Sequence, residues 1–257
     1  MDDFRLLIDL HAQGLRQGPG GDAETERALE LARVDRAAPL KIADIGCGTG
    51  ASALLLARRL NARITAVDLL PDFLEVLQKR AASQGLADRI STLACSMDAL
   101  PFGEEELDII WSEGAIYNIG FEKGVADWWP HLKPGGLLVA SEITWLTNAR
   151  PGELQHHWDE EYPGIDVASA RIRILEKHGY SPAGYFVLPE RCWLDEYYRP
   201  LQARFDDFLE RHRNRADARA IVAAEQREIE LYEKYKACVG YGMYIARKPL
   251  HRDPLSC

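Results

Sequence analysis

Between about residue 40 and residue 145, short apolar runs alternate with stretches whose apolar residues recur at helical spacing. Apolar runs of this length, flanked by turn residues, are typical of buried strands. They lie at Lys41–Ile45, Arg63–Val67, Ile90–Cys95, Leu107–Trp111 and Leu137–Ile143. Helices are predicted between them, as at Ala51–Leu60 and at Pro71–Gln84, where Gly85 marks the end. Strands connected by crossover helices predict an α/β fold with a parallel sheet.

The second part of the chain mixes helices with two more strands. Helical patterns cover Glu153–Glu161 and Val167–His178, and two long amphipathic helices are expected within Trp193–Lys236. Two further apolar runs, Ala183–Leu188 and Gly242–Arg247, bring the expected sheet to seven strands, most of them parallel. The late helices are apolar on one side, so we expect them to form a helical cap beside a sheet that carries helices on both faces.

Composition and charge mainly exclude certain partners and locations for the protein. With 47% hydrophobic and 28% charged residues the chain resembles average globular proteins and can bury a sizeable core. Its net charge of −9 disfavours nucleic acid as a partner, because phosphate binding needs clustered Lys and Arg. No window approaches the roughly 18 apolar residues of a membrane span, and the first residues do not resemble a signal peptide. The five cysteines lack disulfide or zinc spacing, which fits a reducing, cytoplasmic location.

A glycine-rich loop joins the first strand to the first helix of the core. It reads Asp44-Ile45-Gly46-Cys47-Gly48-Thr49-Gly50. Glycines at such a place let a nucleotide-like ligand approach the backbone closely, because they carry no Cβ atom. Asp68 ends the second strand 20 residues after Gly48, the spacing at which a carboxylate can accept hydrogen bonds from both ribose hydroxyls. The two features predict a site for an adenosine-containing cofactor.

A dinucleotide-binding dehydrogenase is the alternative, since Gly46, Gly48 and Ala51 satisfy the pattern G-x-G-x-x-A. Asp44 and Gly50 oppose it, and so do motifs further along the chain that a dinucleotide site does not require.

These further motifs follow one another in order. After the glycine loop come Val67-Asp68, then CSMDALPF at 95–102, LDIIWS at 107–112 and LKPGG at 132–136, the last as a turn before the fifth strand. In this order the chain resembles the class I S-adenosylmethionine-dependent methyltransferases over residues 15–145, and more loosely to the end. Within that family it is similar to the small-molecule methyltransferases grouped with quinone-biosynthesis C-methyltransferases. The resemblance implies a Rossmann-like fold and an enzyme that converts S-adenosylmethionine to S-adenosylhomocysteine.

The resemblance also implies which residues bind the methionine and ribose parts of the cofactor. Gly46, Gly48 and Gly50 would pass beneath them, and Asp44 would face the methionyl amino group, directly or through water. Asp68 would hold the ribose.

The adenine would lie between Leu69 and Met97, with Asp98 accepting a hydrogen bond from its amino group. For Asp98 a turn or helix-cap aspartate is the alternative interpretation. Glu113 is a further candidate for the cofactor's amino group.

The methyl acceptor should lie beyond the carboxyl ends of the fourth and fifth strands, where open parallel sheets bind ligands. Glu113, Tyr117 and Glu142 follow or end these strands, and His11 lies in the N-terminal amphipathic segment. Transfer from a sulfonium is an in-line displacement that depends on alignment, and a base is needed only if the acceptor must lose a proton. These four residues are the catalytic candidates. Each also has a structural interpretation: the glutamates as partners of backbone amides or of a neighbouring cation, Tyr117 as a packed ring, and His11 as an exposed helix residue.

We expect one domain over residues 1–257, with an N-terminal helical cover at 1–35, a cofactor-binding core at 36–148, a cap with the late helices at 149–240, and the last strand and tail at 241–257. Gln17 to Gly21 (QGPGG) has the composition of a lid hinge or of a plain loop. Because specificity comes from what is added to a common core, we expect the cap to choose the acceptor.

No metal is expected. His156 and His157 are adjacent on a predicted helix and point about 100° apart, so they cannot both face one ion. The expected partner is a small-molecule methyl acceptor, modified at O, N, S or C, with neither nucleic acid nor membrane, and a homodimer is left open. The alternatives are a methyltransferase that acts on protein or RNA, and a module that binds S-adenosylmethionine without catalysis.

Overall fold

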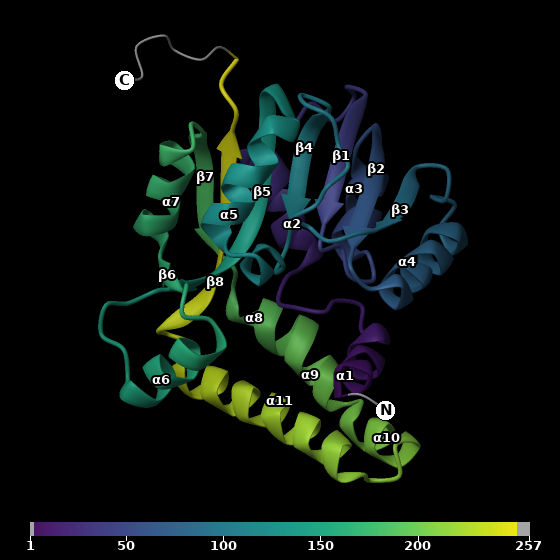
Figure 1. Cartoon of the computed structure of the whole chain (residues 1–257), viewed down its shortest axis with the longest axis vertical. Helices are drawn as coiled ribbons and strands as arrows, with labels where there is room; N and C mark the ends of the chain where they lie inside the picture. The colour runs from purple at the N-terminus through teal and green to yellow at the C-terminus, as the bar shows by residue number, and fades with distance from the viewer. Residues whose placement is uncertain (1–2, 251–257) are drawn as a thin grey trace.

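A twisted sheet of eight strands forms the centre of the molecule (Figure 1). The structure, a computed structural model, describes residues 3–250. Seven strands lie in the order β3-β2-β1-β4-β5-β8-β7, and the two-residue β6 pairs with the end of β5. Their bounds are β1 Leu40–Ile45, β2 Ala62–Asp68, β3 Ile90–Ala94, β4 Leu107–Ser112, β5 Leu132–Trp145, β6 Asp166–Val167, β7 Ser181–Val187 and β8 Val239–Arg247.

The sheet confirms the mostly parallel α/β fold that the apolar runs predict. Strands β1 to β5 pair in parallel, whereas β8 runs antiparallel to both β5 and β7. Residues 133–136 are part of β5 and do not form a separate turn before it. Gly135 has a φ of +81°, and the register with β4 shifts between Leu107 and Ile109. The backbone of Lys248 continues the pairing, because its amide and carbonyl bond Gly136 and Gly135.

Side chains alternate between the two faces of the sheet, and a different group of helices covers each face. Ile42 and Ile109 contribute to the core beneath α2 (Asp22–Leu31), α3 (Ala51–Arg59) and α4 (Pro71–Ser83). Their neighbours Ala43 and Ile110 contribute to the core beneath α5 (Phe121–Trp128) and α7 (Ala168–Lys177). Because both faces of the central strands β1 and β4 are covered, successive residues of these strands are buried, whereas the edge strand β3 is only partly buried.

A group of helices lies below the sheet in Figure 1 and adjoins the carboxyl ends of the parallel strands. It comprises α1 (Asp3–Ala12), α6 (Gly152–Glu161), α8 (Glu190–Trp193), α9 (Arg199–Gln202), α10 (Phe205–Arg211) and α11 (Ala216–Tyr235). We call α6 and α8 to α11 the cap. α1 packs against both α11 and α4, so the N-terminal segment bridges the cap and the core.

Only the second of the two long helices predicted in the cap is a single helix, α11. The first is divided, because α8 passes through a π-helical turn at Leu194–Tyr198 into α9, and α10 begins separately at Phe205. Pro200, which has no N–H to donate, lies just after the π-helical turn and interrupts the regular hydrogen bonding. Residues beyond Leu250, including most of the predicted tail, lie outside the described residues. None of the helices within residues 3–250 is long and apolar enough to cross a membrane.

Gly50 begins α3 with a φ of +89°, and a Cβ atom there would lie 2.1 Å from Leu77 Cδ1 of α4. We predict that Gly50→Ala lowers the free energy of unfolding by about 2–5 kcal/mol, because left-handed strain and overpacking add. Gly85→Ala is the matched control, since Gly85 has a φ of +67° with no atom within 4 Å of a Cβ. It should cost only about 1–2 kcal/mol. Urea denaturation measures both, and equal losses would contradict the packing argument.

Candidate functional site

A cavity of about 740 Å³ opens at the carboxyl ends of β1, β2 and β4 and extends beneath the cap. Its wall on the sheet side includes Gly46, Gly48 and Asp68, with Met97 beside them. Its other walls come from α1, from the segment after β4 and from the cap. The cavity therefore joins the glycine loop to a chamber built from residues far away in sequence.

The three loop glycines have different roles in the structure. Gly46 and Gly48 have φ values of +72° and +53°, and both line the cavity. A Cβ atom at Gly46 would lie 2.2 Å from the Ala115 Cβ, and one at Gly48 would lie 2.3 Å from Gln17 Oε1. The loop is therefore kept free of side chains where it faces the cavity. Gly50 does not line the cavity and instead allows α3 to pack against α4.

Asp68 closes the loop at the end of β2. Its Oδ2 accepts a hydrogen bond from the Gly48 amide at 2.8 Å, and its Oδ1 accepts one from the Leu70 amide at 2.9 Å. Burial raises the pKa of Asp68 above its ordinary value, although these bonds oppose the shift. Since each carboxylate oxygen can accept a second bond, Asp68 keeps acceptor capacity toward the cavity that it lines.

The residues expected around adenine lie at the β2 and β3 ends of the cavity. Leu69 is 62% exposed and lines the cavity together with Met97, whose carbonyl accepts a hydrogen bond from Trp128 Nε1 at 2.9 Å. Asp98 is exposed and does not line the cavity. A hydrogen bond from Ser96 Oγ, 2.6 Å long, holds the pKa of Asp98 below its ordinary value.

Asp44 is completely buried behind the loop. Its Oδ2 accepts a hydrogen bond from Ser52 Oγ at 2.7 Å, but its Oδ1 has no partner among the described residues. Burial raises the pKa of Asp44 to about 7. A buried carboxylate oxygen without a donor is costly, so this position calls for a donor from a ligand or water.

Glu113 is held by protein donors and does not line the cavity. Its Oε2 pairs with Arg16 Nη1 at 2.9 Å, while its Oε1 accepts bonds from Thr25 Oγ1 at 2.6 Å and Trp111 Nε1 at 2.9 Å. The side chains of Arg16 and Glu113 are only 9% and 7% exposed. The carboxylate thus ties the N-terminal segment to the end of β4, a role that sequence reasoning does not reveal because nothing in the sequence pairs Arg16 with Glu113.

Further hydrogen bonds hold the N-terminal segment over the glycine loop. Gln17 Oε1 accepts a hydrogen bond from the Thr49 amide at 2.8 Å, and Gln17 also lines the cavity. Arg80 of α4 donates to Thr49 Oγ1 at 2.6 Å and to the Gly14 carbonyl at 2.9 Å. The sequence places Thr49 in the glycine loop and Gln17 in the QGPGG segment, but it gives no signal for Arg80 or for the contacts that join the three residues.

The chamber beneath the cap contains two of the catalytic candidates. His11 Nε2 lies 3.1 Å from Glu225 Oε1 of α11, and its ring stacks on that of Tyr197. Tyr117 lines the chamber and packs edge to face against Tyr162, with ring centroids 5.9 Å apart. The exposed-helix interpretation of His11 does not hold, because the residue is only 9% exposed.

Two glutamates of the cap, Glu225 and Glu228, line the same chamber and are absent from the sequence-based site. A signal for one of them exists in the sequence. The buried or half-buried positions 218, 222, 229 and 232 of α11 follow helical spacing, and 225 falls on the same stripe. The signal for Glu225 is thus a charged residue at a position where the helical pattern calls for an apolar one.

Glu142 lies in β5, completely buried, with its Oε1 3.3 Å from Arg171 Nη2. Burial raises the pKa of Glu142 to about 7, and the arginine opposes this shift. Glu142 does not line the cavity, so its contact with the chamber is indirect, through Tyr162.

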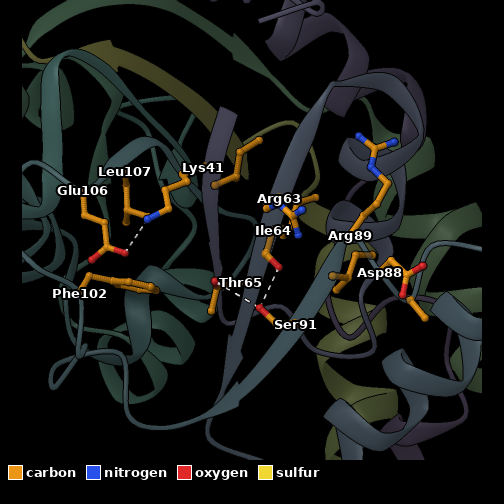
Figure 2. Close-up of a pocket in the computed structure, with 13 residues that line it drawn as sticks. Lys41, Arg63, Ile64, Thr65, Asp88, Arg89, Ser91, Phe102, Glu106 and Leu107 are labelled. Carbon is orange, nitrogen blue, oxygen red and sulfur yellow. Dashed lines mark hydrogen bonds and ion pairs between the residues drawn. The ribbon is translucent and has the colours of Figure 1, made fainter. Parts of the chain in front are cut away.

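A smaller hollow of about 250 Å³ lies at the opposite, amino-terminal edge of the strands (Figure 2). Its polar groups bond one another, as in the Lys41–Glu106 ion pair at 3.1 Å and the bond from Ser91 Oγ to the Ile64 carbonyl at 3.3 Å. Among the described residues, no three His, Cys, Asp or Glu side chains gather as metal ligands, either here or in the large cavity. The large cavity is therefore the candidate active site.

Comparisons with known proteins agree with this geometry. Residues 42–136 match the family model described as a methyltransferase domain. The chain is 33% identical to Methyltransferase GfsG of Streptomyces halstedii over 189 residues, which are 66% of this chain and 66% of that protein. It is 32% identical to the uncharacterized methyltransferase YodH of Bacillus subtilis over 174 residues, 67% of this chain and 72% of that one.

A solved structure shares the whole fold. The S-adenosylmethionine-dependent methyltransferase from Geobacter sulfurreducens, in complex with S-adenosylhomocysteine, superposes with a TM-score of 0.82 at 17% identity, covering 94% of this chain and 97% of that one. The glycine loop, the aspartate after β2 and these similarities lead to one conclusion: the chain belongs to the class I S-adenosylmethionine-dependent methyltransferases, enzymes whose methyl donor is S-adenosylmethionine.

Proposed function

We propose that this enzyme transfers the methyl group of S-adenosylmethionine to a small molecule held in the chamber beneath the cap. The observation that carries the proposal is the continuity of one cavity from Gly46 and Asp68 to Tyr197 and Glu228. A donor bound at the loop and an acceptor bound beneath the cap would meet inside it. The walls contributed by α1 and α11 leave room for a small molecule and favour it over a folded protein or an RNA strand.

The residues present fit the cofactor. Gly46 and Gly48 line the cavity with backbone alone, at positions where a Cβ atom would clash with Ala115 and Gln17, and Asp68 has acceptor capacity for ribose hydroxyls. The unpartnered Oδ1 of Asp44 suits the methionyl ammonium, directly or through water. Leu69 and Met97 offer apolar surface for adenine. When bound, the cofactor supplies an electrophilic methyl carbon, and the protein's own contribution is alignment and exclusion of water.

On the acceptor side, the arrangement supports roles for His11 and Tyr117. The contact between His11 Nε2 and Glu225 Oε1 orients the imidazole in the chamber wall, where the ring can accept a hydrogen bond or a proton from the acceptor. Tyr117 sits where its ring can face positive charge, a contact worth about 0.5–2 kcal/mol. Glu113 and Glu142 are instead engaged by Arg16 and Arg171, which supports a positioning role for both.

The proposal predicts that the purified protein moves label from methyl-labelled S-adenosylmethionine to a component of a metabolite extract and binds S-adenosylhomocysteine. Asp68→Asn should weaken that binding by about 1.5–3 kcal/mol, since a charge-assisted hydrogen bond is lost. Calorimetry and chromatography of the labelled product provide the measurements. Asp88→Asn, an exposed change at the amino edge of the sheet, is the control. Label found only in protein or RNA, or no transfer at all, would refute a small-molecule acceptor.

We also predict a pH dependence that originates at Asp44. Its pKa of about 7 means that the carboxylate needed by the methionyl ammonium disappears as the pH falls through 7. The affinity for S-adenosylhomocysteine should therefore drop about tenfold between about pH 8 and about pH 6. Asp44→Asn should bind weakly at both values, with the dependence flattened. If the variant keeps the full pH dependence, a group other than Asp44 produces it.

The ion pair between Glu113 and Arg16 leads to a further prediction. Glu113→Gln should free residues 14–25 and speed their amide hydrogen exchange about tenfold or more, because charge-assisted bonds to Arg16 are lost. Turnover should fall together with this loosening. A general base at position 113 would instead lower turnover without changing the exchange rates. Glu106→Gln, which removes the exposed ion pair with Lys41, is the control and should change neither.

A further inference from the structure

The chamber beneath the cap is acidic and aromatic, and its charges are unbalanced. Three carboxylates line it, those of Glu161, Glu225 and Glu228. No Lys or Arg is found among the described residues that line the cavity. Outside this lining, Arg16 pairs with Glu113 and Arg171 with Glu142, while the charge of Arg204 acts on Tyr197. Among the described lining residues, an acceptor that carries phosphate or carboxylate would find no basic side chain except His11, which already contacts Glu225.

Glu228 has the weakest support from the protein. Its one hydrogen bond within the described chain comes from the Tyr198 hydroxyl at 2.9 Å, a neutral donor. The side chain of Glu225 is 14% exposed, and its Oε1 lies 3.1 Å from His11 Nε2. Burying carboxylates without a cation is costly, so their retention in a chamber suggests that a cation enters it.

Aromatic rings surround these carboxylates. Tyr117, Tyr197 and Tyr241 line the chamber, and the charges of Glu225 and Glu228 act on Tyr197. Tyr197 and Tyr241 are only 8% and 7% exposed, and neither hydroxyl has a hydrogen-bond partner in the described part of the chain. Ring faces attract cations, and unpartnered phenols can donate to or accept from a ligand.

We propose that the methyl acceptor is an amine, which Glu225 and Glu228 bind as its ammonium ion within this aromatic cage. The inference rests on the proposed function, because it names the acceptor class for the same cavity. The geometry that supports it is the combination of two inward carboxylates, a ring of tyrosines and the absence of a balancing Lys or Arg.

The proposed reaction balances in atoms, electrons and charge. The ammonium first gives one proton to Glu228, whose burial and whose neighbour Glu225 raise its pKa to about 7. The nitrogen lone pair then forms a bond to the methyl carbon while the carbon–sulfur bond breaks and its electron pair remains on sulfur. The products are the methylated ammonium and S-adenosylhomocysteine, and the proton on Glu228 passes to solvent. No further reactant is required.

The test uses a cation that cannot itself be methylated on nitrogen. The full chain loaded with S-adenosylhomocysteine is titrated with meta-(trimethylammonio)phenol and with its neutral isostere meta-tert-butylphenol, and the fluorescence of Trp158 and Trp193, which line the cavity, reports binding. The ammonium should bind about tenfold tighter or more. Glu228→Gln should remove most of this preference. Glu233→Gln, an exposed change on the same helix, should keep it.

The outcomes separate this inference from the proposed function. Equal binding of the two probes, or no saturable ammonium binding, with S-adenosylhomocysteine bound normally, would overturn the amine acceptor alone. A Glu228→Gln variant that loses affinity for S-adenosylmethionine relative to S-adenosylhomocysteine would show that the carboxylate serves the sulfonium, which also overturns it. Failure to bind S-adenosylhomocysteine at all would refute both. A labelled extract product retained by a cation exchanger would support the inference, and a neutral or acidic product would contradict it.

Discussion

The position of β1 between two parallel neighbours determines where this protein can bind a ligand. β1 pairs with β2 on one side and with β4 on the other, and the helices that follow β1 and β4, namely α3 and α5, cover opposite faces of the sheet. The chain segments that leave the two strands therefore diverge and leave a crevice at their carboxyl ends. Into this crevice open the glycine loop, Asp68 and the Gly114–Ala115 segment after β4, and every other part of the site is built around it.

The crevice becomes an enclosed cavity because the N-terminal segment is fastened across it by polar contacts. The carboxylate of Glu113 accepts hydrogen bonds from Arg16 and Thr25, while Thr49 donates its amide to Gln17 and accepts a bond from Arg80. Buried ion pairs add little net stability, since desolvation offsets the attraction, but breaking one leaves a charge uncompensated. Contacts of this kind favour one position of the cover strongly over others. The carboxylate of Glu113 at the end of β4 thus connects the N-terminal segment to the sheet.

Three buried carboxylates share a pKa near 7, and their surroundings distinguish their roles. Glu142 is paired with Arg171 through its Oε1, although its Oε2 has no hydrogen-bond partner among the described residues. Asp44 also has one oxygen without a donor and Glu228 has only a tyrosine, and within the described chain neither carboxylate is paired with a Lys or Arg. These two carboxylates lie at opposite ends of the site, Asp44 behind the glycine loop and Glu228 beneath the cap. This distribution suits a cofactor with an ammonium group at one end and a basic acceptor at the other.

The sequence by itself determined the seven main strands, the glycine loop and the position of Asp68, because side-chain periodicity and positive φ angles are local requirements that leave a local pattern. Only the tertiary structure decided the rest of the site. The sequence offers Glu113 as a catalytic candidate but does not show that Arg16, 97 residues away, pairs with it, nor that Gly50 lies against Leu77 of α4. Glu225 and Glu228 follow the last core motif, which ends at residue 136, by 89 and 92 residues, and they reach the cavity because α11 packs against α1. Contacts between distant segments depend on how helices pack, and packing is not encoded in any single stretch of chain.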